Sequence, residues 1–174
     1  MLSKTERLIL ANQYRILKKL EDDVWYAKKY DEYIKILEEG YEIYYKEILD
    51  LISDENISES EAREVLDILY FYENIVEPYK QKNPNDQDII DHHYSYFKGF
   101  DNNGDELKYL SFVRFLIKDQ RKYAFVAKYA DKTDDFDSHF PMLDKYRKMM
   151  KLLESKYNKR GDLEREEILD ILNA

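Results

Sequence analysis

Apolar residues recur three and four positions apart along most of this chain, which is the spacing of one face of an α-helix. Only four glycines and three prolines interrupt the pattern. The pattern predicts an all-α protein, and no composition break divides the chain. We therefore expect one single-domain helical bundle over residues 1–174, with about seven helices. The expected helices span residues 3–20, 24–52, 58–77, 86–96, 107–117, 142–156 and 163–173.

The second segment carries the most regular pattern. Its apolar positions alternate by three and four residues, as in a heptad stripe. They are Ala27, Tyr30, Ile34, Leu37, Tyr41, Tyr44, Ile48 and Leu51. The phase continues through Gly40, although glycine costs about 1 kcal/mol relative to alanine inside a helix. We predict one long helix near residues 24–52. The stripe faces either the core of its own bundle or a second copy of the chain in a coiled-coil dimer. We favour the core, because tyrosine is poorly suited to a coiled-coil interface.

Two helix starts are marked by capping boxes, in which a serine and a glutamate three residues later satisfy each other's backbone N–H groups. The pairs are Ser3 with Glu6 and Ser58 with Glu61. The helices at 58–77 and 107–117 are apolar on most sides, so we expect both to be central and mostly buried. Pro78 is expected to end the first of them.

Composition excludes several classes of protein. The chain has no cysteine, so disulfides, thiolate metal sites and cysteine nucleophiles are absent. Its start does not resemble a signal peptide, and no apolar stretch approaches the roughly 18 residues of a membrane span. We expect a cytoplasmic protein with no membrane contact. The net charge of −9 argues against nucleic-acid binding, although residues 144–160 hold seven basic and two acidic residues.

No motif for metal binding or catalysis has the required spacing. If the segments that begin at Asp101 and Asp131 are aligned with an EF-hand calcium loop, both lack the glycine at position six and the glutamate at position twelve. His92 and His93 are adjacent and point about 100° apart on a helix, while His139 stands alone. We predict no metal and no cofactor. No nucleophile elbow or phosphate-binding loop is present, so the sequence leans against an enzyme.

Polar residues inside apolar segments offer the best candidate site. Arg114 lies in a helix expected to be nearly surrounded by protein, and Asn12 and Gln13 interrupt the first helix. A buried arginine must be paired or bind an anion. Two interpretations stay open: an ion pair with a central acid such as Asp67, which we favour, or contact with the carboxylate or phosphate of a small anionic ligand.

Several motifs, taken in order, resemble one protein family over essentially the whole chain. They are the segment Leu2–Tyr14, Glu39-Gly40-Tyr41, Phe97-x-Gly99-Phe100-Asp101, Tyr109-Leu110-x-x-Val113-Arg114-Phe115, Pro141-Met142-x-x-Lys145-Tyr146 and the segment Ile171–Ala174. The chain resembles the YfbU family of bacterial proteins. That resemblance implies an all-helical fold without an assigned activity. It also implies a ligand-binding or regulatory role, because some members carry the domain beside a helix-turn-helix segment.

The leading hypothesis is a small-ligand-binding or regulatory helical module. Its candidate binding residues are Asn12, Gln13, Tyr14, Gly99, Phe100, Asp101 and Arg114. One alternative is a protein-interaction or scaffold protein that forms a homodimer through the stripe at residues 27–51. The other alternative is an enzyme of unrecognised type.

Overall fold

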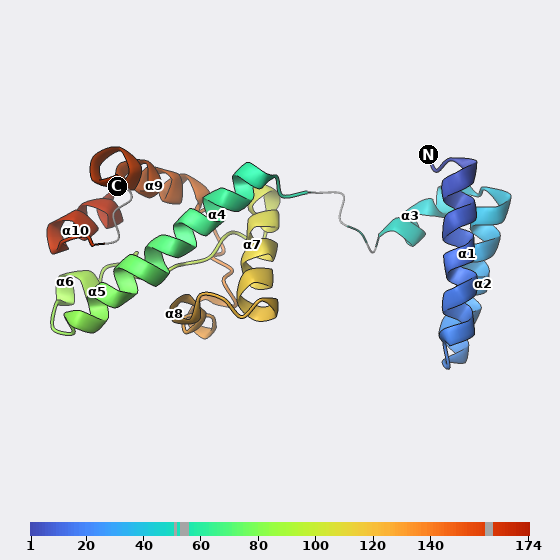
Figure 1. The fold of residues 1–174 in the computed structure, drawn as a ribbon, viewed down its shortest axis with the longest axis horizontal. Coiled ribbons are helices and arrows are strands. Elements are labelled where there is room, and N and C mark those ends of the chain that lie inside the picture. The colour runs from blue at the N-terminus through green and yellow to red at the C-terminus, as the bar shows by residue number, and fades with distance from the viewer. Residues whose placement is uncertain (51, 53–55, 159–161) are drawn as a thin grey trace. The chain divides into compact units, whose positions relative to one another are not determined.

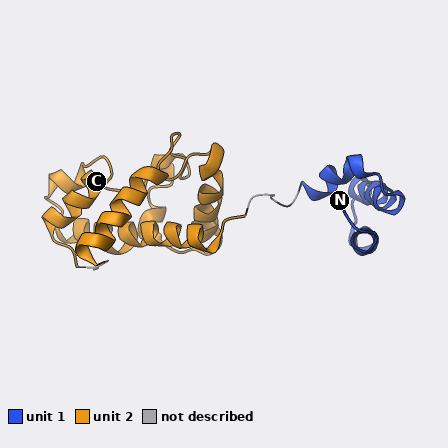
Figure 2. Cartoon of the chain, turned by 90° about the horizontal axis from the view of Figure 1, so that it is seen from above, with its two compact units in different colours: residues 1–54 blue, residues 55–174 orange. Residues whose placement is uncertain are grey.

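The computed structural model describes residues 1–50, 52, 56–158 and 162–174. These residues form helices and loops and include no β-strand, so the all-α prediction is confirmed (Figure 1). They fall into two compact units, residues 1–54 and residues 55–174, which we call unit 1 and unit 2 (Figure 2). The sequence pattern ended one predicted helix at residue 52 and began the next at residue 58, but it did not separate two units there, because no break in composition accompanies the change.

Unit 1 is a helical hairpin followed by short helical turns. Its elements are α1 (Lys4–Leu20), α2 (Val24–Glu39), the 3₁₀ turn η1 (Glu42–Tyr44) and α3 (Tyr45–Leu49). The predicted capping box of Ser3 and Glu6 opens α1, and the Asp23 carboxylate caps α2. The buried hydrophobic residues of the described part are Ala11, Leu37, Tyr45 and Ile48.

The prediction of one long helix over residues 24–52 is wrong, because α2 ends at Gly40. Gly40 has a φ of 73°, and its N–H and the N–H of Tyr41 both donate to the carbonyl of Ile36. This left-handed cap closes the helix, and glycine adopts it without a steric penalty. The periodicity persists beyond Gly40 because η1 and α3 are also helical. Leu51 lies outside the described residues.

The first half of the predicted stripe packs inside the hairpin. Leu37 is buried, and the Tyr30 ring lies 5.7 Å from the Tyr14 ring of α1. The preferred interpretation, in which the stripe faces its own core, therefore holds for α2. Farther along, Ile48 is buried while Tyr41 and Tyr44 are exposed.

The described residues of unit 2 include one hydrophobic core of 27 buried residues. Its α-helices are α4 (Glu59–Phe71), α5 (Glu77–Lys82), α6 (Gln87–Ile90), α7 (Leu107–Arg114), α8 (Ala124–Ala127), α9 (Leu143–Tyr157) and α10 (Arg165–Asn173). The π-helical turns η2 (Tyr72–Val76) and η4 (Phe115–Asp119) and the 3₁₀ turns η3 (Gly104–Glu106) and η5 (Asp131–Thr133) complete it. The predicted capping box of Ser58 and Glu61 opens α4.

The two helices predicted to be central contribute much of this core. The segment formed by α4 and η2 buries Val65, Ile68, Leu69, Phe71, Tyr72, Ile75 and Val76. The segment formed by α7 and η4 buries Tyr109, Leu110, Val113, Leu116 and Ile117. The second segment is less enclosed than expected, because Leu107 and Phe115 are exposed.

Two predicted boundaries in unit 2 are wrong. Pro78 does not end its helix but lies in the first turn of α5, directly after η2. The N–H of Glu77 donates five residues back, to the carbonyl of Tyr72, and this widened turn lets the chain continue into a proline that has no N–H. The helix expected at 86–96 is only α6, because tight turns follow from His92 to Ser95.

No helix among the described residues is both long and apolar enough to cross a membrane.

Candidate functional site

A buried carboxylate joins three segments of unit 2. Glu106 is 5% exposed, and its Oε1 accepts hydrogen bonds from the backbone N–H groups of Met142 at 2.9 Å and Leu143 at 2.7 Å. Its Oε2 accepts from the N–H of Asp101 at 2.9 Å. The side chain of Met142, at the start of α9, has no strong acceptor for these N–H groups. Glu106 therefore caps α9 from another part of the chain.

The loop of Gly99, Phe100 and Asp101 is fixed by close backbone contact. A Cβ atom at Gly99 would lie 1.8 Å from the carbonyl oxygen of Phe136, and Gly99 has a φ of 93°. The N–H of Phe100 donates to that carbonyl at 3.0 Å, and the N–H of Ser138 donates to the Phe100 carbonyl at 3.1 Å. Gly99 and Phe100 are buried, so they position Asp101 at the edge of a cleft.

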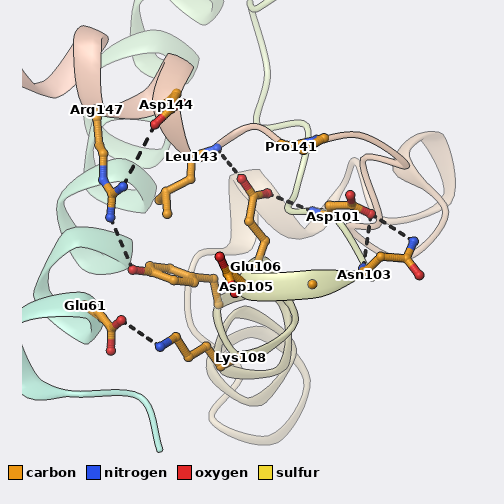
Figure 3. Close-up of a pocket in the computed structure, with 12 residues that line it drawn as sticks. Glu61, Asp101, Asn103, Asp105, Glu106, Lys108, Pro141, Leu143, Asp144 and Arg147 are labelled. Carbon is orange, nitrogen blue, oxygen red and sulfur yellow. Dashed lines mark hydrogen bonds and ion pairs between the residues drawn. The ribbon is translucent and has the colours of Figure 1, made fainter. Parts of the chain in front are cut away.

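That cleft has a volume of about 600 Å³ and is open to solvent (Figure 3). Its walls come from the start of α4, from residues 101–109 and from residues 141–147. The lining residues are Glu61, Asp101, Asn103, Gly104, Asp105, Glu106, Lys108, Tyr109, Pro141, Leu143, Asp144 and Arg147.

The cleft is rich in carboxylates, and its two cationic side chains are already held. Lys108 Nζ lies 2.8 Å from Glu61, and Arg147 donates to both oxygens of Glu64, at 2.7 and 3.1 Å. In contrast, Asp105 makes no hydrogen bond or ion pair with a described residue. The open rim of the cleft is therefore acidic.

Three groups in the cleft have shifted pKa values. The hydrogen bond from Lys108, with those from Ser58, lowers the pKa of Glu61 to about 2. Burial raises the pKa of Tyr109 to about 12, and the hydrogen bond to Glu64 raises the pKa of Arg147. Ion pairing and burial explain all three shifts, so none identifies a general acid or base.

Comparison with known proteins places the chain in a family. A family model described as the YfbU domain matches residues 1–174. The chain belongs to the YfbU family. Its sequence is also 71% identical over 174 residues to the UPF0304 protein MJECS11 of Methanocaldococcus jannaschii, with 100% of both chains covered. This relative is archaeal, so the expectation of a bacterial family is not supported.

In this YfbU domain, Arg114 is partly buried and forms an ion pair. Its Nε lies 3.1 Å from the Asp135 carboxylate and donates to the Asp135 carbonyl at 3.0 Å. The sequence suggested an acid such as Asp67, but the partner is Asp135. Because Gly99 contacts the next residue, Phe136, the structure brings Arg114 and the Gly99 loop against one segment.

The remaining predicted residues lie in unit 1. Asn12 and Gln13 are exposed on α1, so they are not internal polar groups as the sequence suggested. The side-chain oxygen Oδ1 of Asn12 accepts a hydrogen bond from Arg15 at 2.6 Å. Tyr14 is partly buried between the rings of Tyr30 and Tyr33. The predicted binding residues are therefore divided in sequence between unit 1 and unit 2.

In the sequence His139 has no neighbouring histidine, but in the structure two carboxylates lie beside its ring. Its Nε2 lies 3.2 Å from Asp134 and its Nδ1 lies 3.5 Å from Asp137. The three side chains offer donor atoms within 4.8 Å of one another, a set that also suits a divalent metal. The backbone N–H groups of Asn102 and His139 donate to the other oxygen of Asp137, which fixes this carboxylate.

Sequence reasoning missed Glu106, Asp135 and Asp144 as site residues. Glu106 left one usable signal: the helix behind Pro141 has no serine, threonine, aspartate or asparagine immediately before its start, so its cap had to come from elsewhere. The other acids gave no such signal, because 37 acidic residues in the chain make local patterns ambiguous.

Proposed function

We propose that this YfbU protein is a small-ligand-binding or regulatory module, and that the cleft of unit 2 binds a molecule with an amine or guanidine cation. The observation that carries this proposal is the imbalance of charge in a cleft of about 600 Å³. Five carboxylates line it, whereas its two cationic side chains are held by Glu61 and Glu64. Volumes of roughly 300–1,000 Å³ are typical of small-molecule sites.

Helix ends do not cancel this negative charge. The first turns of α4, α7 and α9 border the cleft, and each helix N-terminus carries about half a positive charge. Those partial charges help to keep the nearby carboxylates ionised. They remain smaller than the full negative charge that each carboxylate adds, so the rim still favours a cation.

The geometry also suggests how a ligand would be held. The Asp144 side chain is 95% exposed and its nearest cationic partner, Arg147, is 4.0 Å away. Together with Asp105, it offers carboxylate oxygens that an ammonium or guanidinium group can donate to. Tyr109, Pro141 and Leu143 supply an apolar wall for a short hydrocarbon chain.

Calorimetric titration of the full chain with putrescine, spermidine and agmatine tests this proposal. We expect at least one of these amines to bind, and each of Asp105→Asn and Asp144→Asn to weaken its binding about tenfold, because each variant removes a charge-assisted hydrogen bond. Asp91→Asn, which changes an exposed acid outside the cleft, should leave the affinity unchanged. Succinate serves as the anionic comparison.

Three outcomes would contradict the proposal. The first is that none of the amines binds. The second is that the two cleft variants bind as tightly as the original chain and the Asp91→Asn control. Tighter binding of succinate than of every amine would also reverse the proposed charge preference.

A second candidate is a small anionic ligand at Arg114. Arg114 and Lys118 both contact the single carboxylate of Asp135, at 3.1 and 2.6 Å, which leaves an excess of positive charge there. A thermal-shift screen of anionic metabolites tests this candidate. It predicts stabilisation of the original chain that Arg114→Ala loses, since a ligand stabilises only the state that binds it. Equal stabilisation of both chains would exclude Arg114.

A further inference from the structure

Residues 134–139 bring three metal-ligating side chains to the wall of a second cavity in unit 2. One ring nitrogen of His139 and one carboxylate oxygen each of Asp134 and Asp137 lie within 4.8 Å of one another. All three residues line a cavity of about 240 Å³, which shares no lining residue with the cleft described above. The cavity has room for an ion and for the small molecules that complete its coordination.

We propose that Asp134, Asp137 and His139 bind one divalent transition-metal ion. An imidazole and two carboxylates form a ligand set that zinc and similar ions accept, and three protein ligands leave a position open. Bonds of about 2.0–2.2 Å to such an ion place its donor atoms roughly 3.4 Å apart. The His139 ring already lies 3.2 Å from Asp134 and 3.5 Å from Asp137. Because one ion uses only one ring nitrogen, an exposed side chain must turn to complete the set.

The Asp137 carboxylate gives independent support, because only one of its oxygens is held. Its side chain is 10% exposed. Oδ1 accepts hydrogen bonds from the backbone N–H groups of Asn102 at 3.3 Å and His139 at 2.8 Å. Oδ2 accepts no hydrogen bond from a residue that the structure describes, and it faces His139. A largely buried carboxylate oxygen favours a cation beside it, and hydrogen bonds to the other oxygen fix the orientation of a ligating carboxylate.

A protonated His139 that pairs with both aspartates is the competing explanation. Its contacts of 3.2 and 3.5 Å are longer than the roughly 2.7–2.9 Å of a charge-assisted hydrogen bond. The imidazolium would therefore satisfy neither carboxylate well, and ion pairs at exposed positions contribute little to stability. A metal ion bound to the ring and to both carboxylates would compensate their charge at shorter distances.

Two lysines on the wall of the same cavity set the strength that we expect. The ammonium groups of Lys98 and Lys132 lie 3.5 and 4.7 Å from the centre of the Tyr96 ring. Neither forms an ion pair within the part of the chain that the structure describes. Their positive charges oppose a free cation and attract an anion. We therefore expect affinity in about the micromolar range, with an anion or water as the remaining ligand.

Titration of the full chain with Co²⁺, followed by visible absorption, tests the site, and calorimetry with Zn²⁺ gives the affinity and stoichiometry. We expect one ion per chain. His139→Asn and Asp134→Asn should each weaken binding at least about tenfold, because each removes a ligand. Both positions have a positive φ, which asparagine tolerates, so the loop keeps its conformation.

His92→Gln is the matched control. His92 is one of the other two histidines of the chain, lies outside the cavity and contacts Asn173. This variant should bind Co²⁺ and Zn²⁺ as the original chain does. In NMR spectra of the original chain, Co²⁺ should shift or broaden the amide signals of residues 134–139 before those around His92.

Three results would overturn the proposal. If neither Co²⁺ nor Zn²⁺ binds, the three side chains form only an ion pair. If His92→Gln weakens binding as much as His139→Asn, the ion lies elsewhere on the surface. Displacement of Zn²⁺ by an equal concentration of Mg²⁺ would contradict a site that includes imidazole. Circular dichroism checks each variant, and if His139→Asn loses helicity, Asp134→Asn decides alone, because its side chain is 76% exposed.

Discussion

The two units differ sharply in how they bury apolar surface. Unit 2 encloses 27 buried hydrophobic residues and exposes four large ones, whereas unit 1 buries four and exposes fourteen, counted over the described residues. Small structures bury a smaller fraction of their surface. The comparison teaches that unit 2 has a large hydrophobic core of its own, whereas unit 1 buries only a few hydrophobic residues.

The largest effect should come from Gly99→Ala in unit 2. The new Cβ would lie 1.8 Å from the carbonyl oxygen of Phe136. The backbone cannot move aside without breaking the hydrogen bonds that Phe100 makes with Phe136 and Ser138. We expect a loss of more than about 4 kcal/mol in unfolding free energy, measured by urea denaturation. Gly104→Ala is the matched control: Gly104 also has a positive φ, but nothing lies within 4 Å of its added Cβ. Its loss should be about 1–2 kcal/mol, and equal losses would refute the close-contact argument.

Glu106→Gln should have the next largest effect. Glutamine keeps one acceptor oxygen, but its NH₂ group cannot accept a hydrogen bond, so at least one of the N–H groups of Asp101, Met142 and Leu143 loses its acceptor. We expect a loss of about 2–3 kcal/mol, again from urea denaturation. Asp105→Asn, at the exposed neighbouring position, should change stability by less than about 0.5 kcal/mol. If the two variants are equally stable, Glu106 does not cap α9.

Gly40→Ala tests the weaker unit. A Cβ at Gly40 would lie 2.6 Å from Nη1 of Arg7, which donates to the Leu37 carbonyl at the end of α2. The positive φ and the displaced arginine together should lower the free energy of unfolding by about 1–2 kcal/mol. Circular dichroism during thermal unfolding measures this loss. Gly40→Asn should cost less, because asparagine tolerates the left-handed conformation better. A loss as large as that of Gly99→Ala would erase the expected difference between the units.

The smallest effect concerns acid stability at the rim of the cleft. The pKa of Glu61 is lowered to about 2 from the ordinary 4.5, so its stabilising contribution is present above about pH 4.5 and is lost as pH falls toward 2. Glu61→Gln should make stability decline less steeply over that window. Lys108→Gln should do the same, because Lys108 is the largest cause of the shift. NMR titration that places the Glu61 pKa near 4.5 in the original chain would contradict this account.

Much of the fold could be predicted because its signals are local. The capping boxes at Ser3 and Ser58 each join residues three positions apart, and both formed as expected. Gly40 shows the limit of such reasoning: the periodic pattern continued, but the sequence did not reveal that the glycine would adopt a left-handed cap. Pro78 shows the opposite limit, because a π turn let the helix continue through a residue that usually ends one.

The candidate site was predicted only in part. Asp101 lines the cleft, while Gly99 and Phe100 support it from the core. The cations and acids that give the cleft its charge come from three segments, and nothing in the sequence links them. The partner of Arg114 was missed because Asp135 lies 21 residues farther along the chain.

The sequence by itself determined that this chain is all-helical, where most helices begin, and which family it resembles. Those properties depend on spacing within a turn or two of helix and on side chains that bond to nearby backbone. The tertiary structure alone decided that Glu106 caps a helix 36 residues away and that Asp105 and Asp144 border one cleft. Each of these depends on which distant segments meet, and that is set by packing of the whole core rather than by any local pattern.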